Sequence, residues 1–443
     1  MKPIVALALA APVLVCPRLA QAENGGPLFY SDDAALLSGA AIALPADPAS
    51  VHYNPAGLGA LKRARVSVNG SLFGVRIRSI NGALVTEADG QRSSLDLDSI
   101  DFVSTPTGIT AAFSLHPAVT LGLGFYTTER DIQSAVDDDT MTLPSLDAIA
   151  TQRIDLQLDT TKYQAGAALG FALSDSVRLG VGVFGIYATQ DAYVQFTVDV
   201  DDAQGRAGFE SVTARLATTA WGILPTAGFQ WDVTPAVHLA LVAKAPEIML
   251  AASADSAGTA AVGSTFVDPP VVALEVYEAQ SDTDKVEMLA PARFALGASF
   301  DPTPMVRVAL EAEVSLPVDN QELGVRHEVV ANGRLGVRYQ VAPGLVLGSG
   351  LFTDLASAPL GESLGSRRVH YFGTTLGGTL LTPLSVGGST DPDAIILTTT
   401  LAVRYAVGIG EARTTTYDGG VSYGTTDVVF HDVTPYTGSA ILF

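Results

Sequence analysis

The side chains that most often carry catalysis or bind metals are few and scattered in this chain. Its single cysteine, Cys16, directly follows an N-terminal apolar run, so the chain after this residue has no thiol chemistry. No two histidines have metal-ligand spacing, and no serine, histidine and acid form a hydrolase-like arrangement. We therefore predict no catalytic residue, no metal site, no cofactor and no enzymatic activity. The six histidines are His52, His116, His238, His327, His370 and His431.

The composition of the chain leaves two interpretations open, and its charge argues against nucleic acid. Of the 443 residues 48% are apolar and only 16% are charged, which requires a large core or a surface that faces lipid. The formal net charge of -21 argues against a nucleic-acid partner. Acidic runs such as Asp137-Asp138-Asp139 are expected on solvated loops. The alternative is that divalent cations bridge these runs to phosphorylated surface lipids.

The first 22 residues have the pattern of a secretory signal peptide. Lys2 gives a short positive region, Ile4 to Val15 is an apolar run, and Ala20-Gln21-Ala22 is a small-x-small cleavage site. We expect residues 1–22 to be removed before Glu23. The mature protein is therefore predicted to leave the cytoplasm.

Apolar and polar residues alternate along most of the chain after residue 63, which is the pattern of β-strands. In Val306 to Val314, one face carries valine, leucine and alanine, and the other carries mainly arginine and glutamate. No stretch reads as the roughly 20-residue apolar helix that spans a bilayer. Strands are expected near 64–79, 107–116, 118–129, 158–173, 177–199, 207–231, 236–249, 289–300, 305–316, 327–340, 345–354, 367–381, 394–410 and 432–443.

The connections between these strands alternate between tight turns and long loops, which is typical of outer-membrane barrels. Closure removes every sheet edge, and a sheet in hydrocarbon cannot leave edges unpaired. We therefore predict an all-β fold, in which residues 64–443 form a transmembrane antiparallel β-barrel of about fourteen strands in the bacterial outer membrane. Phe443 is the kind of terminal residue that the barrel-assembly machinery recognises. Long extracellular loops are expected at 80–106, 130–157, 250–288, 317–326, 355–366 and 411–431.

The stretch from Ser38 to Leu61 is apolar but cannot form a regular strand. Pro45, Pro48 and Pro55 each remove a backbone donor. A compact apolar segment without repeating structure must be buried against something. We predict that residues 23–63 form a plug, or hatch, inside the barrel.

The sequence of this stretch resembles the N-terminal plug of the FadL/TodX-type family of outer-membrane channels for long-chain fatty acids and other hydrophobic molecules. The resemblance rests on Gly39-Ala40-Ala41, Asp47-Pro48-Ala49 and Tyr53-Asn54-Pro55-Ala56-Gly57-Leu58, and continues through Pro291 to Leu316 and Arg334 to Asp354. Asn54, Pro55 and Ala56 match the family's plug motif. The segment before the motif is shorter than the glycine-rich lead typical of the family.

The resemblance implies a monomeric, passive uptake channel. A hydrophobic ligand would enter an outer apolar groove, pass to an inner pocket and leave sideways to the membrane at a kinked third strand. That strand would be Ala118 to Glu129, in which Gly122 and Gly124 would permit the kink; the alternative is that these glycines only face a crowded plug. Apolar residues for the outer groove would be Leu143, Leu146, Ile149, Phe266, Val271, Val272, Leu274, Val276 and Tyr277.

Five arginines on the predicted luminal faces are candidates to hold the carboxylate head group of such a ligand. The alternative, which the sequence favours, is that they pair with luminal Glu311 and Glu313. Other functions also stay open, namely a hydrophilic porin and a structural or adhesive barrel whose long loops bind a partner. The five arginines are Arg293, Arg307, Arg334, Arg338 and Arg404.

Overall fold

The computed structural model describes residues 24, 29–320, 325–361, 364–384, 395–418 and 420–443. The expected signal peptide lies outside the described residues. Nineteen strands join in one sheet, whose neighbours are antiparallel except where β2 (Leu84–Ala88) meets β20 (Ile395–Tyr417). Among the residues described, no helix has the length and apolarity needed to cross a membrane.

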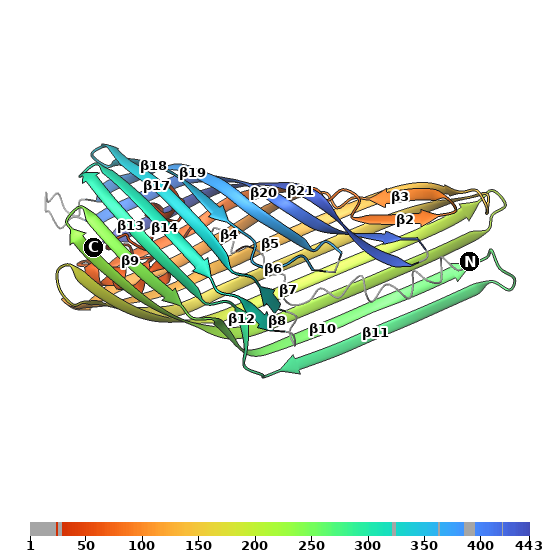
Figure 1. Ribbon diagram of the computed structural model, residues 1–443, viewed down its shortest axis with the longest axis horizontal. Coiled ribbons are helices and arrows are strands. Elements are labelled where there is room, and N and C mark those ends of the chain that lie inside the picture. The colour runs from red at the N-terminus through yellow and green to blue at the C-terminus, as the bar shows by residue number, and fades with distance from the viewer. Residues whose placement is uncertain (1–23, 25–28, 321–324, 362–363, 385–394, 419) are drawn as a thin grey trace.

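The sheet closes on itself, because β1 (Arg65–Arg78) pairs with β21 (Val421–Leu442) on one side and with β4 (Ser99–His116) on the other. Counting consecutive pieces as one strand, the closed sheet has fourteen strands, so the predicted all-β antiparallel barrel is confirmed. Figure 1 shows the strands around the barrel. The others are β5 (Val119–Leu143), β6 (Ala148–Ala172), β7 (Val177–Asp202), β8 (Ala207–Thr234), β9 (Val237–Lys244) with β10 (Glu247–Ser264), β11 (Val271–Thr283) with β12 (Glu287–Ala290) and β13 (Arg293–Thr303), β14 (Val306–Ser315), β17 (Val330–Ala342), β18 (Leu345–Asp354), β19 (Arg367–Leu384) and β20.

Aromatic side chains mark both borders of an exposed apolar band on the barrel. Phe125, Tyr163, Tyr187 and Trp221 form a row across β5 to β8, with ring centroids 5.7, 6.4 and 4.4 Å apart. On β8 the next exposed tryptophan is Trp231. Ten residues of strand rise about 33 Å, which at a tilt of roughly 40° is about 25 Å, the height of the apolar band of an outer-membrane barrel.

Beyond the aromatic row, several strands continue where the sequence predicted loops. The expectation of loops at 130–157, 250–288 and 411–431 is wrong. β5 and β6 run on to a short connection after Leu143, β10 pairs with β11, and β20 stays paired with β21 as far as Tyr417 and Val421. In these extensions the buried face carries both apolar and polar side chains, such as Ala135, Ile154 and Gln133, and Ser134 is exposed on the other face. Outside the bilayer the outer face of a strand is exposed to water. The extended strands therefore carry many Asp and Thr residues on that face, and such a composition is also typical of loops.

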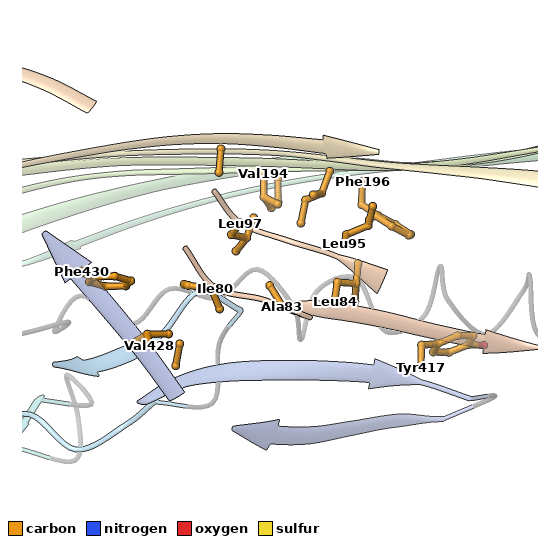
Figure 2. Packing of buried hydrophobic residues seen from close by; sticks show 14 of the residues in the cluster. Ile80, Ala83, Leu84, Leu95, Leu97, Val194, Phe196, Tyr417, Val428 and Phe430 are labelled. Atoms are coloured by element: carbon orange, nitrogen blue, oxygen red, sulfur yellow. The ribbon is translucent and has the colours of Figure 1, made fainter. Parts of the chain in front are cut away.

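A packed apolar core fills the barrel at this extended end. The connection between β1 and β4 folds inward as a hairpin of β2 and β3 (Gln91–Leu95), and its Ile80, Leu95 and Leu97 are at most 1% exposed. They pack against Phe196 and Phe430 of the wall (Figure 2). The part expected as loop 80–106 is therefore largely ordered structure inside the barrel. A separate two-stranded sheet, β15 (Val318–Asn320) and β16 (Val325–His327), lies outside the main sheet.

The N-terminal segment, here residues 29–61, contains α2 (Asp32–Leu36), α3 (Ser50–Tyr53) and a 3₁₀-helix, η1 (Pro55–Ala60). Ser31 caps α2 by accepting from Ala34 N–H (3.2 Å) and donates to Asp47 (2.6 Å). Burial raises the pKa of Asp47 to about 6.

Barrel strands surround this segment and contact it mainly through glycines. A glycine has no side chain, so the wall and the segment can approach backbone to backbone. At Gly180 an added Cβ would lie 2.1 Å from the carbonyl carbon of Pro55. The inward-facing glycines in contact with the segment are Gly122, Gly170, Gly180, Gly228, Gly297, Gly336, Gly348, Gly350 and Gly438.

The Asn54-Pro55-Ala56 motif has a defined structural role in this contact. Asn54 caps η1 by accepting from Ala56 N–H (3.1 Å), and donates to the carbonyls of Ile42 (2.8 Å) and Phe229 (3.3 Å). Pro55 occupies the first position of η1, where a missing N–H costs nothing. The motif therefore ties the segment to itself and to β8.

We expect Gly180→Ala to displace the N-terminal segment, because the new Cβ overlaps the backbone of Pro55 and overpacking costs about 1–3 kcal/mol. The melting temperature should fall and the conductance of the purified protein in planar bilayers should rise. Gly185→Ala on the same strand is the control, because its nearest contact would be 3.7 Å away. Equal effects of the two substitutions would contradict close packing at Gly180.

Candidate ligand cavity and lateral gap

A cavity of about 300 Å³ lies inside the barrel against the N-terminal segment. Phe29, Tyr30, Ile42, His52 and Tyr53 of that segment form part of its lining. The rest comes from inward side chains of the wall and from residues next to β12, β16 and β18. The cavity is therefore separate from the packed apolar core of the β2–β3 hairpin.

The lining of the cavity is more polar than an apolar ligand pathway would require. Lys162 lies between Glu129 (3.4 Å) and Glu247 (3.3 Å), and Arg334 pairs with Glu311 and stands 4.0 Å from Glu313. Most charges on the wall are thus neutralised by a neighbour of opposite sign.

Two cations on the wall are less well neutralised. Lys244 on β9 and Arg293 on β13 are directly opposite in register, and both line the cavity. Like charges opposite each other destabilise a sheet. Arg293 has Glu247 at 4.0 Å, whereas no carboxylate of the described residues lies within ion-pair distance of the Lys244 ammonium, which Glu313 and Glu311 attract from farther away. The pair can therefore accept an anionic group. Sequence analysis missed Lys244, because only the register shows that it faces Arg293.

Aromatic rings join the N-terminal segment to the wall beside the cavity. His52 lies 4.5 Å from Tyr30 and 4.9 Å from Tyr126 of β5, measured between ring centroids. Burial, followed by the charges of Lys244 and Arg293, lowers the pKa of His52 well below its usual range. The imidazole is therefore neutral and packs as an aromatic ring.

The five arginines predicted from the sequence occupy different places. Arg293 and Arg334 line the cavity. The other three are not part of its lining: Arg307 pairs with Asp301 (2.6 Å), Arg338 pairs with Asp33 of the N-terminal segment, and Arg404 pairs with Asp432 (3.2 Å). A head-group role for any of the five stays a prediction.

A gap in the hydrogen-bonded wall lies between β4 and β5. Their ladder begins at His116 and Val119 and ends at Gly108 and Tyr126. Above that pair, β4 continues against β1, and β5 continues against β6 after a bulge between Thr127 and Glu129. Over the described residues 99–107 of β4, no backbone ladder to β5 is present.

Gly122 and Gly124 lie below this bulge and face inward. A Cβ at Gly122 would lie 2.2 Å from Val51 of the N-terminal segment, and one at Gly124 would lie 2.4 Å from the hydroxyl of Tyr126. Gly122 thus makes room for Val51, and Gly124 makes room for the Tyr126 ring. That the two glycines also permit a kink in β5 stays a prediction.

The apolar residues expected in an outer groove do not come together. Leu143 is buried in a small cluster at the outer tip, with Leu146 and Phe266 packed against it. Ile149 is exposed, and Tyr277 packs against the core of the β2–β3 hairpin. The expected single groove is therefore wrong, since the strand extensions separate these residues. The remaining four, Val271, Val272, Leu274 and Val276, are exposed on β11.

Glu311 links the wall to the N-terminal segment, because it accepts from the N–H groups of Ala41 (3.1 Å) and Ile42 (3.2 Å) while it pairs with Arg334. We expect Glu311→Gln to destabilise the protein by about 3–5 kcal/mol, as breaking a buried ion pair does. Thermal unfolding measures the change. Glu313→Gln is the matched control and should cost less, because it removes only a 4.0 Å contact with the same arginine. The reverse order would contradict this assignment.

The fold recurs in solved structures, although no protein-family model and no curated protein sequence matches the chain. A Pseudomonas aeruginosa FadL homologue aligns with a TM-score of 0.60 at 11% identity, over 95% of this chain and 99% of that one. The P. putida toluene transporter TodX gives 0.60 at 11% identity, over 94% and 98%. The Ralstonia pickettii toluene transporter TbuX gives 0.54 at 11%, over 94% and 99%. The chain therefore has the fold of the FadL/TodX-type outer-membrane barrels, as the resemblance in its sequence predicted.

Proposed function

We propose that this protein is a passive outer-membrane uptake channel for hydrophobic small molecules, and that residues 23–63 act as its plug. The observation that carries the proposal is the cavity, which lies inside a closed barrel and is bounded by the N-terminal segment. The solved barrels of the same fold include two toluene transporters. Each barrel has its own cavity, so a monomer is sufficient.

A hydrophobic solute gains from such a path because the sugar layer of the outer membrane is polar. Shielding the solute from water is worth about 0.8 kcal/mol for each methylene that is buried. Movement of the plug would convert the cavity into a passage, and the sequence has no nucleotide-binding loop that would supply energy. Transport is therefore driven by the concentration gradient.

The charges in the cavity favour an amphiphilic ligand with an anionic head, such as a long-chain fatty acid, over a plain hydrocarbon. A carboxylate placed between Lys244 and Arg293 would relieve the repulsion between these two neighbours. Of the five arginines considered from the sequence, Arg293 is the one with the weakest carboxylate contact.

We place the exit of the ligand at the gap between β4 and β5. The gap begins level with Phe125, at the outer border of the apolar band. Phe102 on β4 is 69% exposed beside it, so the outside of the gap is apolar. A ligand that leaves here would emerge beside Phe102, at the outer border of the apolar band.

A structural or adhesive barrel is the second candidate function. The specific observation in its favour is the exposed apolar row on β11, where Val272, Leu274 and Val276 are 59–78% exposed. Such a row is a possible contact site for a partner at the cell surface.

Uptake of a labelled fatty acid and of toluene should be measured in cells with and without the gene, and with a variant that lacks residues 38–61. A channel predicts loss of uptake without the gene, and leakage of small polar solutes after the deletion. An adhesin predicts neither change, and that result would refute the channel. Surface labelling and heat-modifiable gel mobility check that the deletion variant reaches the membrane folded.

The double variant Lys244→Gln/Arg293→Gln should lower fatty-acid uptake at limiting concentration about tenfold, as the loss of a charge-assisted hydrogen bond does. Toluene uptake should not change. Arg307→Gln is the control, because Arg307 is ion-paired away from the cavity. If the uptake of fatty acid and of toluene falls equally, Lys244 and Arg293 do not recognise the head group.

A further inference from the structure

Side chains replace the backbone ladder in the gap between β4 and β5. On the open edge of β5, the carbonyl of Arg130 accepts from Arg76 (2.8 Å) and that of Ile132 accepts from Arg78 (3.1 Å). The N–H of Ser134 donates to the carboxylate of Asp101 (3.0 Å). In an antiparallel strand alternate residues point their N–H and C=O to the same side, so all three groups belong to one edge.

The carboxylate of Asp131 is the centre of this arrangement. Arg76 contacts it at 2.6 Å and Arg367 at 2.7 Å, and Arg78 is ion-paired with it as well. The Asp131 side chain is only 2% exposed. Arg76 and Arg78 belong to β1, on the far side of β4, and Arg367 belongs to β19, so three guanidinium groups from elsewhere in the barrel hold the open edge of β5.

We propose that Asp131 with Arg76, Arg78 and Arg367 forms a latch that holds the lateral gap closed and that must release for the gap to widen. The latch is defined by these four residues. A ladder of backbone hydrogen bonds separates only if the barrel is broken, whereas side chains can change partners while β1 keeps its ladders to β4 and β21. The transport consequence of the latch rests on the proposed function, but its closure of the gap does not.

The latch lies next to a contact with the N-terminal segment. The hydroxyl of Tyr30 donates to the carbonyl of Thr127 (3.3 Å), at the bulge where the gap begins. The ring of Tyr30 also lies 4.9 Å from that of Tyr126, the last residue of β5 that is laddered to β4. A shift of the N-terminal segment would therefore move Thr127, which lies at the lower end of the gap and four residues before Asp131.

Other charged groups complete the network around the latch. Arg78 has Asp101 at 3.9 Å, Arg76 has Asp432 at 3.4 Å, and Arg404 shares Asp432 at 3.2 Å. Removing one arginine therefore leaves no isolated carboxylate at Asp131, and single-arginine or double-arginine variants are expected to fold. Arg367 also donates to Gln133 of β5.

Hydrogen exchange followed by mass spectrometry tests the latch without any transport assay. In Arg76→Gln/Arg78→Gln, amides in residues 130–136 of β5 should exchange at least tenfold faster than in the unchanged protein. Arg178→Gln is the matched control: it removes another buried pair, with Asp232, where the ladder between β7 and β8 is complete. Its local exchange should change less than threefold. Unchanged exchange at residues 130–136 would overturn the latch.

A covalent link across the gap tests the reverse change. Asp101→Cys/Ser134→Cys places one thiol on each side of the gap, in a mature chain that has no other cysteine after the expected signal, and a short thiol-reactive cross-linker that contains a reducible disulfide bond joins them. Fatty-acid uptake should fall at least tenfold when the link is formed and return after reduction. If the cross-linked barrel shows full uptake while hydrogen exchange is faster in Arg76→Gln/Arg78→Gln, the latch is supported and the lateral exit is refuted. Slow exchange in the arginine variant would refute the latch, whatever the uptake.

Discussion

The ladder between β1 and β21 joins the first barrel strand to the last, and the rest of the structure depends on it. In hydrocarbon an unpaired N–H or C=O costs several kcal/mol, because no water can replace the missing partner. A sheet that faces lipid must therefore close. Once it is closed, the number of strands sets the size of the interior, and everything inside must fit that space.

Closure explains why so much of the N-terminal segment is buried without regular structure. The interior needs filling, but another strand would have no edge to pair with. Short helices satisfy their own backbone, and caps such as Ser31 and Asn54 satisfy the helix ends. The inward-facing glycines supply the remaining fit by letting Pro55 and Leu37 approach the wall directly. The result is a filled barrel with a cavity on one side of the filling.

The gap between β4 and β5 is one place where the wall departs from the closure rule; among the described strands, β11 also pairs on one side only, with β10. The gap begins at the outer border of the apolar band, where water and polar lipid groups become available to an unpaired edge. Arginines then serve as donors to the free carbonyls of β5. A guanidinium group carries five donors and stays charged, so a few arginines can satisfy carbonyls and a carboxylate together. Side chains thereby satisfy part of the edge of β5 that backbone pairing leaves open.

The sequence by itself indicated the strands, because alternation of apolar and polar residues is a local property that survives in any register. The contrast between tight turns and long connections then indicated that these strands form a barrel. The sequence also indicated the buried N-terminal segment, since three prolines among apolar residues exclude both a strand and an exposed linker. It could not determine where the strands end: outside the bilayer the wet face of a strand, as around Asp138 and Ser134, has the composition of a loop. Strand register and barrel closure depend on pairs of residues that lie far apart in the sequence. Only the tertiary structure could therefore place Lys244 opposite Arg293, separate Arg293 from Arg307, or bring Arg76 and Arg367 to Asp131.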